Sequence, residues 1–293
     1  MSDSAALGVF DAAFLRALER LAFRLRRERA AVGAGTVRRE RRGGRVEFAD
    51  HRPYAPGDDP RHVDWAAYAR TGRFYVKEFE REEDLAVLVC VDASASMALH
   101  GKARAALRLG YALAYLAVAA GSRARVAALR AGDVELSATV SATPRLPDLA
   151  RFLSAVAFAG TTDLDGSLAR IPVAARGARV LVVVSDLIAA RDGRAALAAH
   201  AARGDDVHVL HVVAAGDREL PTDGPYVLVD AETGERVPVP ADAAARLARD
   251  AAGREQGWRE FAARHRATYA PVAAAGSVED AVLGWLRAGG VLA

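Results

Sequence analysis

The stretch VLVCVDASASM, Val87–Met97, decides the fold class. Its apolar run ends at Asp92, and two serines follow at alternate positions, Ser94 and Ser96. A continuous apolar run of this length is typical of a strand covered on both faces, as in a parallel sheet. Residues that follow such a strand lie where open α/β sheets bind their ligands. The stretch therefore predicts an α/β fold and leaves three interpretations of Asp92 open: a metal ligand, a nucleophile, or part of a helix N-cap.

Apolar strands alternate with helices from Leu85 to the end of the chain. This alternation predicts a doubly wound, mainly parallel sheet with helices on both faces. Two short alternating runs around ETGE predict a β-hairpin inserted late in the domain. The expected strands are 85–91, 123–132, 134–140, 179–187, 206–214 and 267–274; the helices are 101–121, 144–160, 163–177, 191–204, 242–265 and 277–289; the hairpin is 225–240.

The N-terminal region has a different character. Apolar residues at helical spacing predict an amphipathic helix over 9–28, and the glycine-punctuated basic segment that follows predicts a loop. Residues 45–79 carry a turn cluster, YAPGDDP, and an alternating strand, RFYVKEF. We therefore divide the chain into an N-terminal extension, 1–83, and an α/β domain, 84–293.

Composition narrows the class of protein. Cys90, the single cysteine, lies inside an apolar strand and indicates a core residue, with no disulfide framework. The longest apolar helical stretch is shorter than the ~20 residues of a membrane span, and no secretory signal is recognisable, so we expect a soluble cytoplasmic protein. Arginines crowd between Arg16 and Arg45, whereas Lys77 and Lys102 are the only lysines. No recognition-helix pattern accompanies the arginines, which favours a solvated helix face over nucleic-acid binding.

Three polar segments are expected at the same edge of the sheet. Asp92, Ser94 and Ser96 follow the first strand of the domain, Asp186 ends another, and Thr162 lies in a loop between two helices. Carboxylates and hydroxyls form an all-oxygen set, which Mg²⁺ prefers. With few ligands bound directly, a coordination position stays open for an outside carboxylate. The pattern predicts a cation site, with Mg²⁺ as the expected ion and Mn²⁺ or Ca²⁺ as alternatives.

The same segments, VDASASM, AGTTDLDGSL and VVVSDL, resemble the metal-ion-dependent adhesion site of von Willebrand factor A domains. That motif is Asp-x-Ser-x-Ser, then a threonine, then an aspartate after an apolar strand. Asp92, Ser94 and Ser96 match its first segment, Thr162 its second and Asp186 its third, with Thr161 replacing a glycine of the usual pattern. The resemblance implies a von Willebrand factor A-like fold and Mg²⁺-dependent capture of a partner's Asp or Glu.

The N-terminal segment VEFADHRPYAPGDDPRHVDWAAYARTGRFYVKEFERE resembles the signature of a bacterial family named domain of unknown function 58 (DUF58). Members of that family are found with MoxR-type AAA+ ATPases. The resemblance therefore implies a metal-dependent protein-interaction module, acting as an adaptor for such an ATPase, and no enzymatic reaction.

Other interpretations of the motifs remain as alternatives. A metal-dependent hydrolase of phosphatase or nuclease type would use the same carboxylates, although Ser94 replaces the second carboxylate that a nucleophilic Asp92 would need. No G-x-S-x-G, G-x-G-x-x-G or phosphate-loop motif is present. The cluster DHRPYAPGDDPRHVDW favours an Arg–Asp network over a His/Asp metal site. Apolar residues beside the predicted site, Leu99 and Ile188 among them, would form either a docking rim or buried helix starts.

Overall fold

A computed structural model describes residues 8–33, 48–53, 68, 72, 74–79, 86–172, 179–189, 191–217, 227–239 and 243–289. The chain forms two compact units, one of Met1–Gly35 with Leu85–Ala293 and one of Thr36–Asp84. The first unit thus includes the N-terminal helix, which the sequence-based division assigned to the extension. The Arg–Asp network predicted within 51–70 and the arginines of 34–45 lie outside the described residues and side chains.

The larger unit is built on a six-stranded sheet in the order β10-β7-β6-β3-β4-β5. All neighbours are parallel except β5, which runs antiparallel to β4. The predicted doubly wound, mainly parallel α/β fold is therefore confirmed. The strands are β3 Ala86–Asp92, β4 Arg123–Arg130, β5 Asp133–Leu136, β6 Arg179–Ser185, β7 Asp206–Val213 and β10 Thr268–Ala273.

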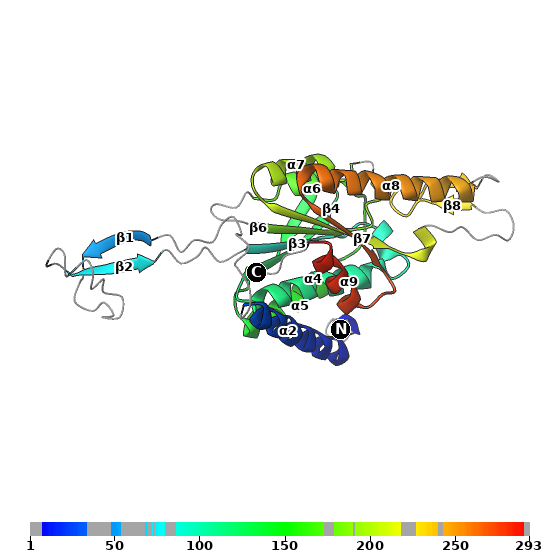
Figure 1. Cartoon of the computed structure of the whole chain (residues 1–293). Coiled ribbons are helices and arrows are strands. Elements are labelled where there is room, and N and C mark those ends of the chain that lie inside the picture. The colour runs from blue at the N-terminus through cyan, green and yellow to red at the C-terminus, as the bar shows by residue number, and fades with distance from the viewer. Residues whose placement is uncertain are drawn as a thin grey trace. The chain divides into compact units, whose positions relative to one another are not determined.

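Helices cover both faces of this sheet (Figure 1). Alternate residues of β3 enter different cores: Val89 and Val91 pack on one side, and Leu88 and Cys90 on the other. Continuous apolar strands are needed because both faces are buried. The first face carries α4 Lys102–Ala119, α5 Leu146–Ser154 and α9 Val278–Arg287; the second carries α6 Leu164–Ala169, α7 Arg194–Ala202 and α8 Ala243–His265.

The predicted N-terminal amphipathic helix is α2, Ala12–Gly33, which packs against α4 and α9. Asp11 accepts a hydrogen bond from the backbone N–H of Phe14 at 2.8 Å and so caps the first turn. Arg108 of α4 donates to Asp11 at 2.6 Å and to the carbonyl of Val9 at 2.7 Å. These contacts and the aromatic side chains Phe10 and Phe14, which lie beside Tyr111, attach α2 to the larger unit.

Two small antiparallel pairs complete the described strands. In the smaller unit, β1 Phe48–Pro53 pairs with β2 Tyr75–Phe79. In the larger unit, β8 Val227–Val229 pairs with β9 Arg236–Pro238 and forms the predicted inserted hairpin.

Two predicted helices are too long: the helix predicted over 163–177 ends as α6 at Ala169, and the helix predicted over 144–160 is also shorter. The sequence pattern extends a helix to Gly160, but α5 ends at Ser154. The chain beyond Ser154 is hydrogen-bonded to the loop after β3. The N–H of Ala159 donates to the carbonyl of Ala93, and the carbonyl of Gly160 accepts the N–H of Ala95, both at 3.0 Å. Helical hydrogen bonding would leave these groups unavailable, so tertiary pairing replaces the last turns of the helix.

The strand order places a topological switch point between β3 and β6. From β3 the chain proceeds outward to β4 and β5, and then returns to β6 on the other side and continues to β7 and β10. Helices that leave adjacent strands toward opposite faces open a crevice at the carboxyl ends of those strands, which is where open α/β sheets bind ligands. Asp92 ends β3, and Asp186 follows β6 directly, so both lie at this point.

Candidate metal-binding edge of the sheet

The loop after β3 gathers the first three predicted residues. Asp92 and Ser94 are fully buried, and Ser96 is half-buried. The N–H of Ser94 donates to Asp92 Oδ1 at 3.0 Å, which curls the loop tightly behind the strand. The hydroxyls of Ser94 and Ser96 lie 3.0 Å apart. The short 3₁₀ turn Ser96–Ala98 begins without a side-chain cap, so these hydroxyls do not act as the helix N-cap considered above.

The end of β6 contributes the next groups. Ser185 donates its hydroxyl to Asp92 Oδ2 at 2.6 Å and accepts the N–H of Leu187 at 2.9 Å. Asp186 is buried and accepts the N–H of Ile188 through Oδ1 at 3.1 Å. Leu187, between them, has a φ of 57°, a left-handed conformation that costs energy for a branched side chain. Asp186 lies near enough to the end of β3 for its charge to help raise the pKa of Asp92. Ser185 was not among the predicted residues.

Thr162 approaches from the loop before α6. The backbone of that loop is tied to the β3 loop through the hydrogen bond from Ala95 to Gly160. Thr162 is half-buried, whereas its neighbour Thr161 is exposed. The next residue, Asp163, caps α6 by accepting the N–H of Gly166 at 2.8 Å. The hydroxyl of Thr162 does not join the Ser94–Ser96 pair; it donates to a carboxylate of the β8–β9 hairpin, that of Glu232, at 2.5 Å.

A lysine that the sequence reasoning missed lies inside the site. Lys102, at the first position of α4, is only 2% exposed. Its ammonium donates to Asp186 Oδ2 at 2.7 Å and to Asp217 Oδ1 at 2.9 Å. Asp217 lies in a 3₁₀ turn just after β7, so a third carboxylate reaches the same edge. Composition is the sequence feature that could have drawn attention to Lys102. The chain has 40 basic residues but lysine at just two positions, and Lys102 is one of them.

The two buried aspartates have different electrostatic surroundings. Burial raises the pKa of Asp92 to about 6, and the nearby charge of Asp186 adds to this effect. Hydrogen bonds from Ser185 and Ser94 oppose it but do not cancel it. Burial alone would lower the pKa of Lys102; the carboxylates of Asp186 and Asp217 outweigh burial and raise it, so Lys102 stays protonated. Asp186 therefore has a cationic partner, while the hydrogen-bond partners of Asp92 in the described chain are neutral.

These groups fit a hard cation by chemistry. Asp92 is a buried carboxylate held by neutral donors, which is unfavourable unless a positive charge is added. Adjacent hydroxyls and carboxylates supply oxygen ligands of the kind that Mg²⁺ takes. Within the described residues, no three His, Cys, Asp or Glu side chains are grouped to hold a metal. A cation here would therefore depend on the hydroxyls of Ser94, Ser96 and Thr162.

The structure separates the apolar residues beside the site into two kinds. Met97 and Leu187 are buried, so they belong to the core. Leu99 and Ile188 are 44% and 37% exposed, so they remain on the surface next to the two loops. A rim of two residues therefore replaces the wider rim considered from the sequence.

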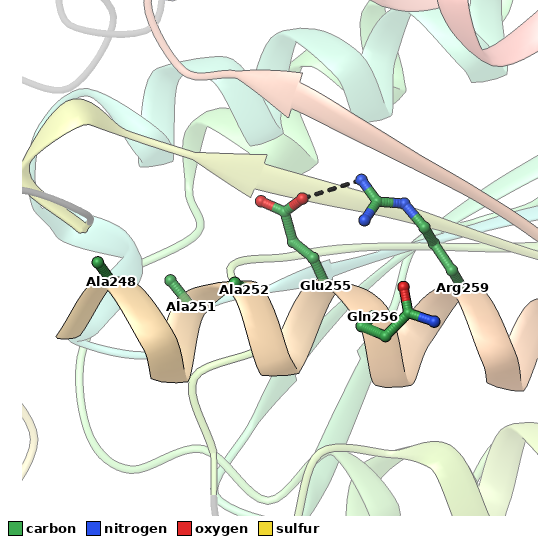
Figure 2. A pocket seen from close by; sticks show the side chains of 6 residues that line it. All are labelled: Ala248, Ala251, Ala252, Glu255, Gln256 and Arg259. Carbon is green, nitrogen blue, oxygen red and sulfur yellow. Dashed lines mark hydrogen bonds and ion pairs between the residues drawn. The ribbon is translucent and has the colours of Figure 1, made fainter. Parts of the chain in front are cut away.

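A shallow pocket elsewhere on the molecule lies along one face of α8 (Figure 2). An ion pair between Glu255 and Arg259, at 3.0 Å, spans it beside three alanines. Its walls include none of the predicted site residues. Three of its six lining residues are alanines, whose small side chains account for the depression.

Comparison with known proteins agrees with the signature seen in the N-terminal segment. The model of the family described as "Protein of unknown function DUF58" matches residues 50–259. The chain belongs to the DUF58 family. The match runs from β1 into α8 and so includes every residue of the candidate site.

The DUF58 chain is similar to uncharacterized proteins of Mycobacterium tuberculosis (strain ATCC 25618 / H37Rv) and Mycobacterium bovis (strain ATCC BAA-935 / AF2122/97). Each is 32% identical to it over 200 residues, which are 64% of this chain and 61% of the relative. The alignment thus spans about three fifths of the length of these relatives.

Among solved structures, the DUF58 chain resembles a conserved hypothetical protein BatB from Bacteroides thetaiotaomicron, at 17% identity and a TM-score of 0.46, over 69% of this chain and 97% of that one. It also resembles a von Willebrand factor type A protein from Catenulispora acidiphila, at 12% identity and a TM-score of 0.35, over 45% and 34%. The fold assignment itself rests on the sheet topology. Every helix in the described part of the DUF58 chain is too short or too polar to cross a membrane.

Proposed function

We propose that this chain is a Mg²⁺-dependent protein-interaction module that captures an acidic side chain of a partner. The observation that carries the proposal is Asp92: a buried carboxylate with a raised pKa, neutral hydrogen-bond partners and the Ser94–Ser96 hydroxyl pair beside it. A cation bound there would remove the cost of burying this charge. Its place at the switch point between β3 and β6 is also where ligands bind in this fold.

In this proposal, Ser94, Ser96 and Thr162 hold the ion, and Asp92 and Asp186 bind it directly or through water. The ion supplies a positive charge that fixes a partner's Asp or Glu. The chain's own residues determine how strongly the ion is held and how strongly it attracts the partner's carboxylate. Lys102 holds Asp186 Oδ2, so Asp186 shares its charge between the ammonium and the ion, and Asp92 carries most of the uncompensated charge.

We further propose a MoxR-type AAA+ ATPase as the partner, with the module acting as its adaptor. The support is family membership together with the exposed Leu99 and Ile188 beside the site, because exposed apolar side chains around a charged centre are typical of docking surfaces.

Calorimetric titration of the EDTA-treated protein with MgCl₂, followed by capture of a MoxR-type ATPase from the same genome, tests the proposal. We expect one Mg²⁺ site, and capture that EDTA abolishes. Ser96→Ala should weaken both, because it removes a ligand from a half-buried position without opening the core. Ser277→Ala, which removes the N-cap hydroxyl of α9 and none of the proposed ligands, is the matched control. Wild-type capture that persists in EDTA, or capture by Ser96→Ala in Mg²⁺ at the wild-type level, would contradict the proposal.

A metal-dependent hydrolase is the alternative use of the same carboxylates. It requires turnover, so a phosphatase and nuclease screen with Mg²⁺ and Mn²⁺ separates it from a binding module. Product formation that Asp92→Asn abolishes would favour the hydrolase.

A further inference from the structure

The β8–β9 hairpin reaches the proposed cation site through one side chain. Both oxygens of the Glu232 carboxylate bind Thr162: Oε2 accepts its backbone N–H at 2.9 Å, and Oε1 accepts its hydroxyl at 2.5 Å. The two residues are 70 positions apart in the chain. A short, two-point contact between a carboxylate and a neutral residue is among the stronger hydrogen-bonding arrangements in proteins.

The turn that carries Glu232 is held by its own hydrogen bonds. Asp230 Oδ1 accepts the N–H of Glu232 at 2.8 Å and that of Thr233 at 2.7 Å. These backbone hydrogen bonds are the main reason that the pKa of Asp230 lies below its ordinary value. The N–H of Asp230 closes the turn on the carbonyl of Glu235 at 2.8 Å. Glu232 is therefore presented from a preformed turn, with its side chain free to project.

Between residues 227 and 239, which the structure describes, little else of the hairpin is buried. Over the described range 227–239, Glu232 and Val239 are the residues that are partly buried, and all others are exposed. The exposed residues include four large apolar side chains. They are Val227, Leu228, Val229 and Val237. Val239 follows the second strand, so the two strands and the turn between them bury no apolar side chain and gain little from the hydrophobic effect. The Glu232 contact therefore decides where the tip of the hairpin lies.

The direction of the hydrogen bond matters for a cation. A hydroxyl that coordinates a metal does so with an oxygen lone pair, and its proton must then be donated elsewhere. Thr162 already donates its proton to Glu232, so its lone pairs are available. The same contact holds a negative charge next to the proposed ligand. Thr162 and Glu232 thus present a ligand oxygen and a carboxylate together.

We infer that Glu232 is the chain's own carboxylate ligand at this site and occupies the position that the proposed function gives to a partner's acidic residue. The inference rests on the proposed function, since it requires a cation at Thr162. A partner must then displace the hairpin to bind, and the hairpin acts as a built-in competitor. The partner must therefore offer an acidic segment with more contact area than the single glutamate contact of the hairpin.

Mn²⁺ alone tests this inference, because it reports both affinity and the number of bound waters. We compare wild type with Glu232→Gln, which keeps the size of the side chain and removes its charge, and with Glu235→Gln as a matched control in the same turn. Calorimetry gives the dissociation constant, and water-proton relaxation gives the relaxivity per bound Mn²⁺.

Glu232→Gln should bind Mn²⁺ roughly tenfold more weakly, in line with the loss of a ligand or its close support. Its relaxivity per bound ion should rise, because a water replaces the carboxylate. Glu235→Gln should match wild type in both. Equal affinity and equal relaxivity in wild type and Glu232→Gln would overturn this inference alone. Failure of wild type to bind Mn²⁺ at millimolar concentration would instead overturn the proposed function, and this inference with it.

Discussion

The ammonium of Lys102 lies 2.7 Å from Asp186 Oδ2 and 2.9 Å from Asp217 Oδ1, at the edge of the sheet where an oxygen-ligand site is proposed. The side chain of Lys102 therefore already supplies one positive charge at this edge of the sheet. Its position divides the carboxylates: Asp186 and Asp217 are paired, and Asp92 accepts hydrogen bonds from neutral donors. This division explains why Asp92, more than Asp186, is expected to control binding of a second cation.

Lys102→Met should destabilise the metal-free protein strongly. The change leaves Asp186, and the mostly buried Asp217, without their cation. Removal of one partner from a buried ion pair costs about 3–5 kcal/mol. Urea denaturation at pH 7 in EDTA measures the loss. Arg104→Met on the same helix, where the side chain is 59% exposed, should change the free energy of unfolding by less than about 0.5 kcal/mol. A loss below about 1 kcal/mol for Lys102→Met would contradict the pairing.

Asp92→Asn should stabilise the metal-free protein at neutral pH. The pKa of Asp92 is about 6 in the folded chain against an ordinary value of 3.8. The folded pKa is the higher one, so the stability from this group is present below about pH 4 and is lost as the pH rises through 6. The full difference is on the order of 2–3 kcal/mol.

The measurement is the free energy of unfolding of wild type and Asp92→Asn between pH 4.5 and 8 in EDTA. The variant should be the more stable at pH 8, and the gap should narrow as the pH falls. A gap that stays constant over this range, or one of opposite sign, would show that burial of the Asp92 charge is not costly.

The Cys90 thiol should be unreactive in the native protein. Burial raises its pKa to about 12, and the thiolate is the species that reacts with thiol reagents. At pH 8 we expect no modification by Ellman's reagent until guanidinium is added, and then one thiol per chain. Complete modification of the native protein within minutes would mean that β3 opens readily.

Leu99→Ser and Ile188→Ser should separate docking from metal binding. Both side chains are exposed beside the site, so their replacement should change the free energy of unfolding by less than about 0.5 kcal/mol and leave Mg²⁺ affinity unchanged. Capture of the partner should fall, because the apolar contacts around the carboxylate are lost.

Met97→Ala is the informative comparison for these two variants. Its side chain is buried, and the cavity created should cost about 2–5 kcal/mol. If Leu99→Ser and Ile188→Ser reduced stability as much as Met97→Ala, or left partner capture at the wild-type level, the proposal that Leu99 and Ile188 form a docking rim would be wrong.

Much of the fold follows from local patterns. The apolar runs ending at Asp92 and Asp186 predicted parallel strands covered on both faces, and the six-stranded sheet confirms this. The ETGE segment predicted the inserted hairpin, and β8 and β9 pair around it. The end of α5 was predicted wrongly, because residues 159 and 160 pair with the β3 loop. Helix periodicity contains no information about such long-range hydrogen bonds.

The sequence by itself determined which residues end the strands, and hence that Asp92 and Asp186 lie at one sheet edge, because parallel strands align their carboxyl ends. Tertiary structure alone decided which side chains contact Asp186 and Thr162. Lys102 reaches Asp186 from 84 positions away, and Glu232 reaches Thr162 from 70 positions away. Both contacts depend on where a helix and a hairpin pack, which short-range spacing does not encode. Buried charge has to be compensated by whatever the fold brings near, and for Asp186 that is the ammonium of Lys102.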